Sequence, residues 1–381
     1  MLDCQRDKFF LPEGVPYLNC AYMSPMMIKV EEKGIEGMQK KRFPYQVSPQ
    51  DFFSDTDELR NLFAEIIDAP EANRIVVIPS VSYGMATVTR NLKLSKGDEV
   101  IVAGEQFPSN VYPWMNACRN QGAELKIIAP PELAEGRGKK WNENILEAIS
   151  RKTKLVAISH CHWADGTIFE LKKIRQRTRE VGALLVIDGT QSVGAFPFSV
   201  KEIEPDALVC AGYKWLMGPY SIGLAYYGPH FDNGSPVEEN WINRFESENF
   251  ANLINYQENY QPGALRYEVG EHSNFILVPM LKAALKQIIK WQVPEISGYC
   301  TQLTREAISI LRNKGYLIED DAYRSPHLFG VRFKEKTSFE KTQALLQQHK
   351  VSVSVRGTSI RISPNVYNNF DDISVLLKCF E

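Results

Sequence analysis

An aspartate and a lysine, each at the end of an apolar stretch, have the clearest chemical potential in this sequence. Asp188 ends the apolar run 183–187 and is followed by the small polar loop 189–192. An unpaired carboxylate at the end of a buried strand is costly, so Asp188 needs a partner. Lys214 lies within the aromatic and apolar segment 213–217. Such surroundings lower the pKa of a lysine and make its amine available as a nucleophile toward an aldehyde.

Taken singly, each of these residues has a plain structural explanation. A lone aspartate at such a place is more often a helix N-cap or a member of a structural ion pair, and a lone lysine is usually on the surface. Together, Asp188 and Lys214 supply the two groups that pyridoxal 5′-phosphate (PLP) demands. An amine forms the Schiff base with the aldehyde, and a carboxylate keeps the ring nitrogen protonated so that the ring accepts electrons. The pair predicts a PLP enzyme in which both residues are catalytic.

Alternating strands and helices must position these residues. Apolar runs typical of buried strands, with helical stretches at 85–92 and 114–121, occur at 74–79, 99–103, 125–128, 154–159, 183–188, 207–210 and 222–227. Continuous apolar strands separated by helices predict an α/β domain with a mostly parallel sheet covered on both faces. Ligands of such sheets bind at the carboxyl ends of the strands, where Asp188 lies. The polar stretch 135–140 is expected to be an exposed loop.

The pattern changes after about residue 260. Helical runs precede short strand-like pieces and a final helical stretch, at 280–291, 296–314, 328–333, 351–355, 359–363 and 371–379. This mixture predicts a smaller α+β domain. We therefore expect an N-terminal segment (1–44) that borders the substrate pocket and the small domain, a large cofactor-binding α/β domain (45–260) and a small C-terminal α+β domain (261–381).

Two segments carry a resemblance to a known family. The segment 186–192 (VIDGTQS), followed by 211–215 (AGYKW), resembles the class V aminotransferases, whose members include cysteine desulfurases, selenocysteine lyases, kynureninases and isopenicillin N epimerase. The resemblance implies the fold-type I PLP-transferase scaffold. It also implies that Lys214 forms the Schiff base, that Asp188 pairs with the pyridine nitrogen, and that Gln191 hydrogen-bonds the 3′-oxygen or the imine.

The resemblance implies further cofactor contacts. Val81 and Ser82 match the turn that holds the phosphate at the start of a helix, where backbone N–H groups and the helix dipole favour an anion. Phe107 falls where relatives stack an aromatic residue or a histidine on the pyridine ring. His162 is matched to an asparagine that contacts the 3′-oxygen in the desulfurases. Gly270 lies in a segment that reaches into the neighbouring subunit's phosphate site, which implies a homodimer with shared active sites.

Substrate-binding residues are also implied near both ends of the sequence. Arg361, in the segment SIRISPNVYN, matches the arginine that holds the substrate α-carboxylate through a bidentate fork, a geometry that lysine cannot reproduce. Arg356 is the weaker candidate for this role. Asn19 belongs to the segment 17–22, which resembles an N-terminal strand that borders the substrate pocket.

The reaction is less well defined than the cofactor. Cysteine desulfurases carry a sulfur-accepting cysteine shortly before the arginine, whereas segment 355–361 has none, and Tyr213 stands where they usually place a histidine. An aminotransferase or a carbon–sulfur or carbon–carbon lyase is favoured. An amino-acid epimerase, a desulfurase-like protein without the loop cysteine and a non-catalytic PLP-binding protein remain alternatives. A nucleotide-binding dehydrogenase is disfavoured because no G-x-G-x-x-G follows the first strand.

The amino-acid composition and net charge limit the kinds of partner that this protein is expected to bind. Of the 381 residues 44% are hydrophobic and 24% charged, and the formal net charge is −2, which predicts a globular protein without affinity for nucleic acid or anionic membranes. The first residues do not read as a signal peptide, and no apolar stretch approaches the length of a membrane span. The seven cysteines are scattered, which argues against disulfides and fits a reducing cytoplasm. His160 and His162 lack a third ligand, so we expect no metal.

Overall fold

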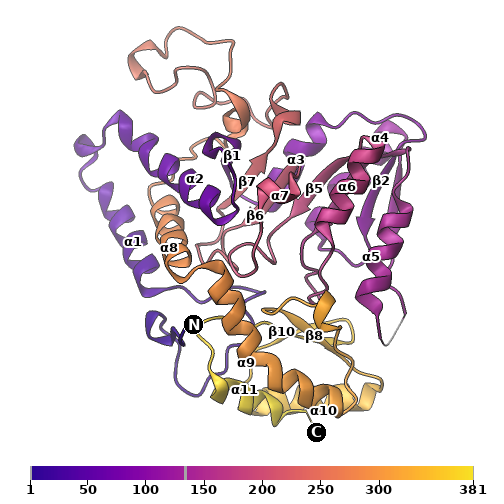
Figure 1. Cartoon of the computed structure of the whole chain (residues 1–381). Helices are drawn as coiled ribbons and strands as arrows, with labels where there is room; N and C mark the ends of the chain where they lie inside the picture. The colour runs from indigo at the N-terminus through magenta and orange to yellow at the C-terminus, as the bar shows by residue number, and fades with distance from the viewer. Residues whose placement is uncertain (1, 133–134, 381) are drawn as a thin grey trace.

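The computed structural model describes residues 2–132 and 135–380. Figure 1 shows a large body built around one central sheet, with a smaller body of helices and a short sheet beneath it. The fold is therefore an α/β domain joined to a smaller α+β domain, and the predicted fold class is confirmed.

The central sheet has seven strands in the order β1-β7-β6-β5-β4-β2-β3. Only β7 runs antiparallel to its neighbours β1 and β6, and the remaining pairs are parallel. The strands are β1 (Ile75–Ile78), β2 (Glu99–Ala103), β3 (Glu124–Ile128), β4 (Thr153–Ser159), β5 (Leu184–Asp188), β6 (Ala207–Ala211) and β7 (Gly223–Tyr227). Each lies within two residues of an apolar run expected from the sequence.

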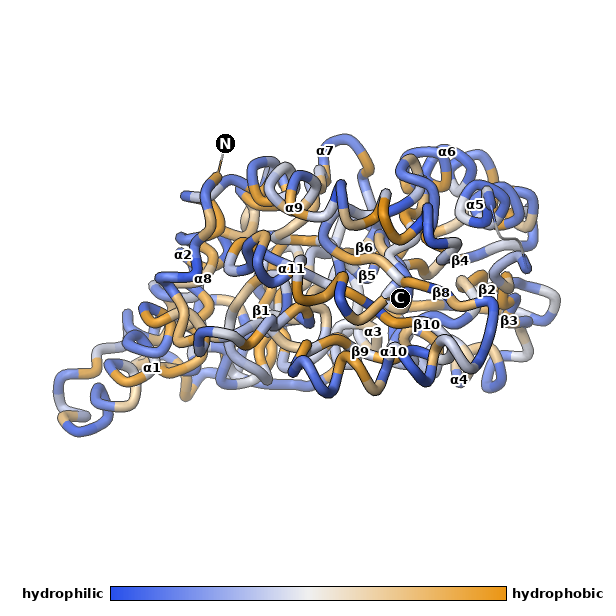
Figure 2. The backbone as a smooth tube through the Cα atoms, turned by 90° about the horizontal axis from the view of Figure 1, so that it is seen from below, coloured by the Kyte–Doolittle hydropathy of each residue, from blue (hydrophilic) through white to orange (hydrophobic). Residues whose placement is uncertain are grey.

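Helices cover both faces of this sheet. Alternate strand residues enter two separate apolar clusters, for example Ile101 and Val156 on one face and Val100 and Leu155 on the other. The first face is packed by α2 (Ser54–Ile66), α5 (Arg137–Ala148), α6 (Leu171–Val181) and α8 (Leu277–Trp291), and the second by α3 (Val81–Asn91) and α4 (Tyr112–Gln121). The outer helices α5 and α6 are largely hydrophilic in Figure 2 because only one stripe of each meets the sheet.

The small domain is built on a three-stranded antiparallel sheet in the order β8-β10-β9. Its elements are α9 (Val293–Asn313), β8 (Phe329–Arg332), α10 (Lys336–Gln348), β9 (Ser354–Arg356), β10 (Ser359–Ile362) and α11 (Phe370–Leu377). The domain boundary expected at residue 260 stays a prediction. Helix α8 lies beyond it, yet this helix packs against α1 (Ile28–Lys40) and α2 and belongs to the large apolar cluster.

Two local expectations need correction. The polar stretch 135–140 is not a loop throughout, because α5 begins at Arg137, which is buried and ion-paired with Asp165. The buried ion pair explains how a polar sequence starts a packed helix. Helix α3 begins at Val81, four residues earlier than its apolar pattern indicated, because Ser80 caps it.

The N-terminal segment joins the two domains. Tyr17 and Asn19 form β-bridges with Ser352 and Ser363 around the small sheet. The Ser24 backbone N–H donates to the carbonyl of Tyr213, in the loop that follows β6, at 3.1 Å. The segment therefore contacts the small sheet and the edge of the large one. Within residues 2–132 and 135–380, no helix combines the length and apolar character needed to cross a membrane.

Candidate active site

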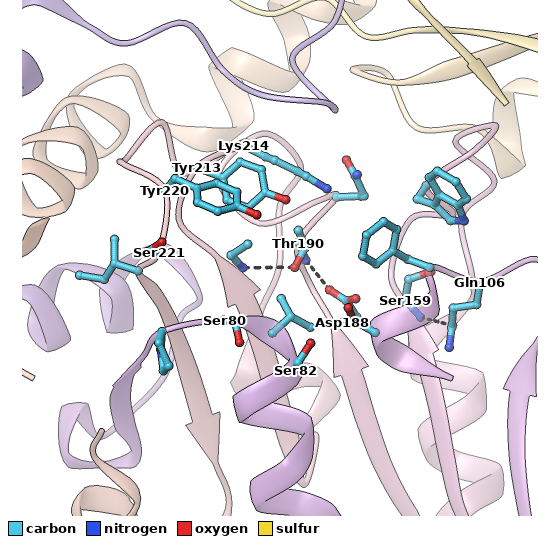
Figure 3. Close-up of a pocket in the computed structure, with 18 of the residues that line it drawn as sticks. Ser80, Ser82, Gln106, Ser159, Asp188, Thr190, Tyr213, Lys214, Tyr220 and Ser221 are labelled. Atoms are coloured by element: carbon cyan, nitrogen blue, oxygen red, sulfur yellow. Dashed lines mark hydrogen bonds between the residues drawn. The ribbon is translucent and has the colours of Figure 1, made fainter. Parts of the chain in front are cut away.

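A pocket of about 300 Å³ opens at the carboxyl ends of β1, β2, β4, β5 and β6. Loops that leave these strands bring the lining residues together although they are far apart in sequence (Figure 3). Of the residues singled out from the sequence, those that line the pocket are Val81, Ser82, Phe107, Asp188, Gln191, Tyr213 and Lys214. Its place agrees with the rule that α/β sheets bind ligands at this edge.

Asp188 is the last residue of β5 and lies beside Ser159, the last residue of β4. Its Oδ1 accepts a hydrogen bond from the Thr190 backbone N–H at 3.0 Å. Burial raises the pKa of Asp188 above its ordinary value, against the hydrogen bonds of Thr190 and the positive charge of Lys214. Because a carboxylate has about four acceptor positions, Asp188 can still accept from a cationic N–H in the pocket.

Lys214 reaches into the pocket from the loop after β6 (Figure 3). Its side chain is buried, and its Nζ lies 5.3 Å from the centre of the Phe107 ring and 5.4 Å from that of Tyr213. Burial lowers the pKa of Lys214 to about 8, with Asp188 opposing the shift and Arg361 adding to it. A substantial fraction of this amine is therefore neutral near neutral pH, the form that reacts with an aldehyde.

The start of α3 forms the opposite end of the pocket. Ser80 caps the helix, with its Oγ accepting from the Tyr83 backbone N–H at 3.2 Å. Val81 and Ser82 follow in the first turn and line the pocket, and both serines lie below Asp188 in Figure 3. The first N–H groups of a helix have no partner within the helix, so this end suits a phosphate.

Gln191 and Phe107 line the part of the pocket between Lys214 and the start of α3. The Gln191 Nε2 donates to the carbonyl of Ala21 at 3.1 Å, and its Oε1 accepts from the Trp215 Nε1 at 2.9 Å. Its amide therefore ties the Asp188 loop to the N-terminal segment and to the residue after Lys214. The Phe107 ring packs edge-on against Trp163, with centroids 5.5 Å apart.

His162 does not line the pocket, in contrast to the expectation from the sequence. It is fully buried, with its Nδ1 3.0 Å from Asp165 Oδ1 and its Nε2 3.1 Å from the carbonyl of Glu105. Both ring nitrogens are therefore occupied by protein groups. Ser159, Cys161 and Trp163 line the pocket instead, because residues alternate in direction where the chain leaves β4. That alternation was visible in the sequence and points to Trp163.

The remaining expected residues lie outside the pocket wall. Arg361 is buried on β10, where its Nη1 donates to the carbonyl of Trp163 at 2.9 Å and its Nη2 to Ser354 Oγ at 3.3 Å. Asn19 Oδ1 accepts a hydrogen bond from the same Ser354 hydroxyl at 2.8 Å. Asn19 therefore supports Arg361 indirectly, through Ser354. The Gly270 N–H donates to Glu238 within the same chain, which leaves that N–H no free capacity for a phosphate.

Ser159 and Tyr220 also line the pocket, although no sequence pattern pointed to either residue. The Ser159 hydroxyl is buried and has no hydrogen-bond partner. Tyr220 lies beside Tyr213, with ring centroids 4.6 Å apart, in the loop that enters β7. Ser221 next to it has a φ of 66°, a strained value for a residue with a side chain. Such contacts come from chain folding and leave no local pattern.

The side chains present fit PLP. The pocket offers an amine, a buried carboxylate across from a helix N-terminus, an aromatic ring and the orphaned Ser159 hydroxyl, which needs a polar ligand atom to satisfy it. When bound, PLP supplies an electron sink for bonds at the amino-acid Cα. In the described parts of the chain, no three His, Cys, Asp or Glu side chains are grouped as metal ligands.

Known proteins resemble the chain along most of its length. The aminotransferase class V family model matches residues 47–376. An uncharacterized aminotransferase, YcbU of Bacillus subtilis, is 27% identical over 320 residues, 84% of this chain and 81% of its own. A probable cysteine desulfurase of Pyrococcus abyssi is 31% identical over 179 residues, 46% of this chain and 43% of its own.

Solved structures share the fold. A mutant of C-DES with glycine covalently linked to its PLP cofactor superposes with a TM-score of 0.85 at 17% identity, covering 98% of each chain. The cysteine desulfurase CsdA of Escherichia coli gives a TM-score of 0.80 at 19% identity, covering 98% of this chain and 96% of that one. Together with the family match and the residues of the pocket, they lead to one conclusion: the chain belongs to the class V aminotransferase family and is a PLP-dependent transferase or lyase that acts on an amino acid.

Proposed function

We propose that this protein is a carbon–sulfur lyase, in which Lys214 carries PLP and then removes the Cα proton of a sulfur-containing amino acid. The observation that carries the proposal is a single desolvated amine opposite a buried carboxylate, in a pocket without a reactive cysteine. A thiol has an ordinary pKa of about 8.5, so a sulfur leaving group departs as a thiolate without a strong acid to protonate it. Carbon–carbon cleavage has no comparably stable leaving group.

Lys214 is the base we assign to the Cα proton. Burial raises the pKa of Tyr213 to about 12 and the pKa of Cys161 to about 12, so neither side chain is ionised near neutral pH. An epimerase usually needs a proton carrier on each face of the substrate, and the aromatic Phe107 and Trp163, which line the pocket with Lys214, cannot act as a second base. This arrangement favours reactions that one base can serve.

A persulfide relay is disfavoured by the position of the cysteines. The turn between β9 and β10 consists of Gly357 and Thr358. Cys161 in the pocket and Cys20 behind it are fully buried, and burial raises the pKa of the Cys20 thiol to about 11. The thiolate is the nucleophile that accepts sulfur, so such thiols are inert. Sulfur is therefore expected to leave on a fragment of the substrate.

The other pocket residues receive binding roles in this proposal. Asp188 holds the proton on the pyridine nitrogen, and the first turn of α3, at Val81 and Ser82, holds the phosphate. Phe107 lies against the ring. Arg361 binds the substrate α-carboxylate, and its contact with the carbonyl of Trp163 keeps its guanidinium next to the pocket wall.

Transamination is the second candidate. It would use the same base, because Lys214 would remove the Cα proton and PLP, when bound, would supply the electron sink. The description of the Bacillus subtilis relative as an aminotransferase favours it. The two reactions differ in their products, since elimination releases pyruvate, ammonia and a thiol, whereas transamination consumes a keto acid.

We also propose a homodimer in a reducing cytoplasm. An exposed group of large apolar side chains on segment 241–256 supports self-association, and all seven cysteines are free, which suits a reducing compartment.

The test uses PLP-loaded protein incubated with cystine, with S-methylcysteine, and with alanine plus a keto acid. We expect pyruvate and ammonia from the first two, together with cysteine persulfide from cystine and methanethiol from S-methylcysteine. Reduction with borohydride, followed by peptide mass analysis, should place PLP on Lys214. The Lys214→Ala variant should lose both the modification and turnover, and Lys173→Ala, on the exposed face of α6, should lose neither. Modification at another lysine, or turnover retained by Lys214→Ala, would refute the proposal.

A further inference from the structure

Two arginines, Arg356 and Arg361, contact the same residue of the pocket wall, Trp163. The guanidinium of Arg356 lies over the Trp163 ring at 5.0 Å, and Arg361 donates to the carbonyl of Trp163 at 2.9 Å. Arg356 ends β9 and Arg361 lies on the neighbouring strand β10, so a tight hairpin fixes their spacing. Trp163 lines the pocket, so both guanidinium groups lie directly behind a residue of the pocket wall, although neither arginine lines the pocket itself.

Neither guanidinium has an acidic partner. In residues 2–132 and 135–380, no carboxylate oxygen lies within 4.0 Å of Arg356 or Arg361. Arg356 donates only to the adjoining carbonyl of Val355, and Arg361 only to a carbonyl and a hydroxyl. The Nε atom of each arginine is buried without a hydrogen-bond partner. The fully buried Arg361 and the buried Nε of the half-buried Arg356 are donors that an anionic acceptor would satisfy.

The two charges also affect each other and the lysine. Burial lowers the pKa of Arg361 to about 9, with the nearby positive charge of Arg356 adding to the shift. Both arginines help to lower the pKa of Lys214. Three cationic groups are therefore close enough to interact, and Asp188 opposes the shift of the Lys214 pKa that the two arginines favour. One substrate carboxylate satisfies Arg361 and leaves Arg356 uncompensated.

We propose that Arg356 binds a second anionic group at the end of the substrate side chain, so that the preferred substrates are amino acids whose side chain ends in a carboxylate or a similar anion. This inference rests on the proposed function only for the role of Arg361 at the α-carboxylate. The Trp163 ring holds the Arg356 guanidinium by a cation–π contact, and the N–H groups that do not donate to the carbonyl of Val355 can bind an oxyanion. A neutral side chain would leave this desolvated donor unpaired.

Binding of unreactive acids tests the proposal without any turnover. Calorimetry of the PLP-loaded protein should show glutarate binding about tenfold or more tightly than pentanoate, which has the same carbon chain but one carboxylate. Arg356→Gln should bring the two affinities together, and Arg356→Lys should retain part of the preference because it keeps the charge but loses the fork. Lys336→Gln, a charge removed from an exposed side chain on α10, should leave the preference unchanged.

Turnover gives a second and separate readout. If the chain is a carbon–sulfur lyase, kcat/KM for S-carboxymethylcysteine should exceed that for S-methylcysteine by about tenfold or more, and Arg356→Gln should bring this ratio close to one. Glutarate preference without turnover of either compound would contradict the lyase function and support the second anion site. Turnover of both compounds, with equal affinity for glutarate and pentanoate in the unaltered protein, would overturn the anion site and leave the lyase function standing.

Discussion

Burial in the same pocket shifts the pKa values of Lys214 and Asp188 in opposite directions. Burial disfavours charge on both, so the pKa of the lysine falls to about 8 and the pKa of the aspartate rises, while each charge partly stabilises the other. The lysine can therefore lose its proton near neutral pH. A cationic partner favours the ionised form of the aspartate, and the protonated nitrogen of a pyridine ring would be such a partner.

The lowered pKa of Lys214 predicts how cofactor-free protein captures PLP as pH changes. The reactive amine is the neutral form, so the capture rate should increase about tenfold per pH unit below pH 8 and become constant above it. Rapid-mixing absorbance measurements would give this profile. Nα-acetyl-lysine, whose side-chain pKa is about 10.4, is the control and should keep accelerating to pH 10. A protein profile that also rises to pH 10 would mean that the amine is not desolvated.

The sequence located the chemically distinctive residues of the site better than their neighbours. Asp188, Gln191 and Lys214 lie in a motif of fixed order, and the structure brings all three to one pocket. His162 and Trp163 show the limit, because the resemblance identified the stretch but the direction of alternate side chains decides which residue faces the pocket. Arg356 became informative only when its missing partner and its contact with Trp163 were visible.

At the scale of elements, the strands were predictable and several helices were not. β1 to β7 are continuous apolar runs because both faces of the sheet are covered, and such runs stand out in a sequence. The start of α5 could not be recognised in the sequence. Its first turn contains a buried arginine, Arg137, whose partner Asp165 lies 28 residues away. Helix α8 lies in the part of the chain assigned to the small domain, yet its residues join the large apolar cluster, and only packing shows which cluster a helix joins.

Gly194 shows how two loops of the site depend on close packing. It has a φ of 100°, and a Cβ at this position would lie 2.4 Å from the carbonyl oxygen of Trp215, the residue after Lys214. Gly194→Ala should therefore lower the free energy of unfolding by about 2 kcal/mol or more, through both strain and collision. Urea denaturation followed by circular dichroism would measure the loss.

A matched glycine separates strain from collision. Gly122 also has a positive φ, 74°, but a Cβ there would meet nothing within 4 Å. Gly122→Ala should lower the free energy of unfolding by only about 1 kcal/mol. Equal losses in the two variants would show that the Asp188 and Lys214 loops can move apart at no cost, contrary to the packing described above.

At the scale of the whole molecule, a projecting segment carries an unusual apolar surface. Ile254 is 82% exposed and Tyr256 is 96% exposed, and Trp241, Phe245 and Leu253 on the same segment are also exposed. A salmon-coloured loop of this part of the chain extends away from the body in Figure 1. Soluble proteins seldom leave such groups uncovered, so this surface is the contact that we assign to the proposed homodimer.

Light scattering can test this assignment. The unaltered protein should have twice the chain mass of 43.4 kDa, and Ile254→Asp should shift the population toward the single chain, because a charge cannot be buried there without a partner. Phe370→Asp is the matched control, since Phe370 is also exposed but starts α11, where an acidic residue is tolerated. A dimer that survives Ile254→Asp but not Phe370→Asp would place the contact elsewhere.

The N-terminal segment that joins the two domains makes contacts that can form only late in the synthesis of the chain. Arg6 pairs with Asp372 at 3.1 Å, and these residues are separated by 366 positions in the chain. Asn19 and Ala21 also depend on a distant residue, Ser363. The backbone and the hydroxyl of Ser363 form hydrogen bonds with this segment. While the chain emerges from the ribosome, the central sheet can form first, but the pocket cannot be closed by its N-terminal border until residues 352–372 have been translated. The central sheet can thus be complete once β7 has been translated, whereas the contacts of the N-terminal segment with Ser363 and Asp372 can form only after those residues have been added.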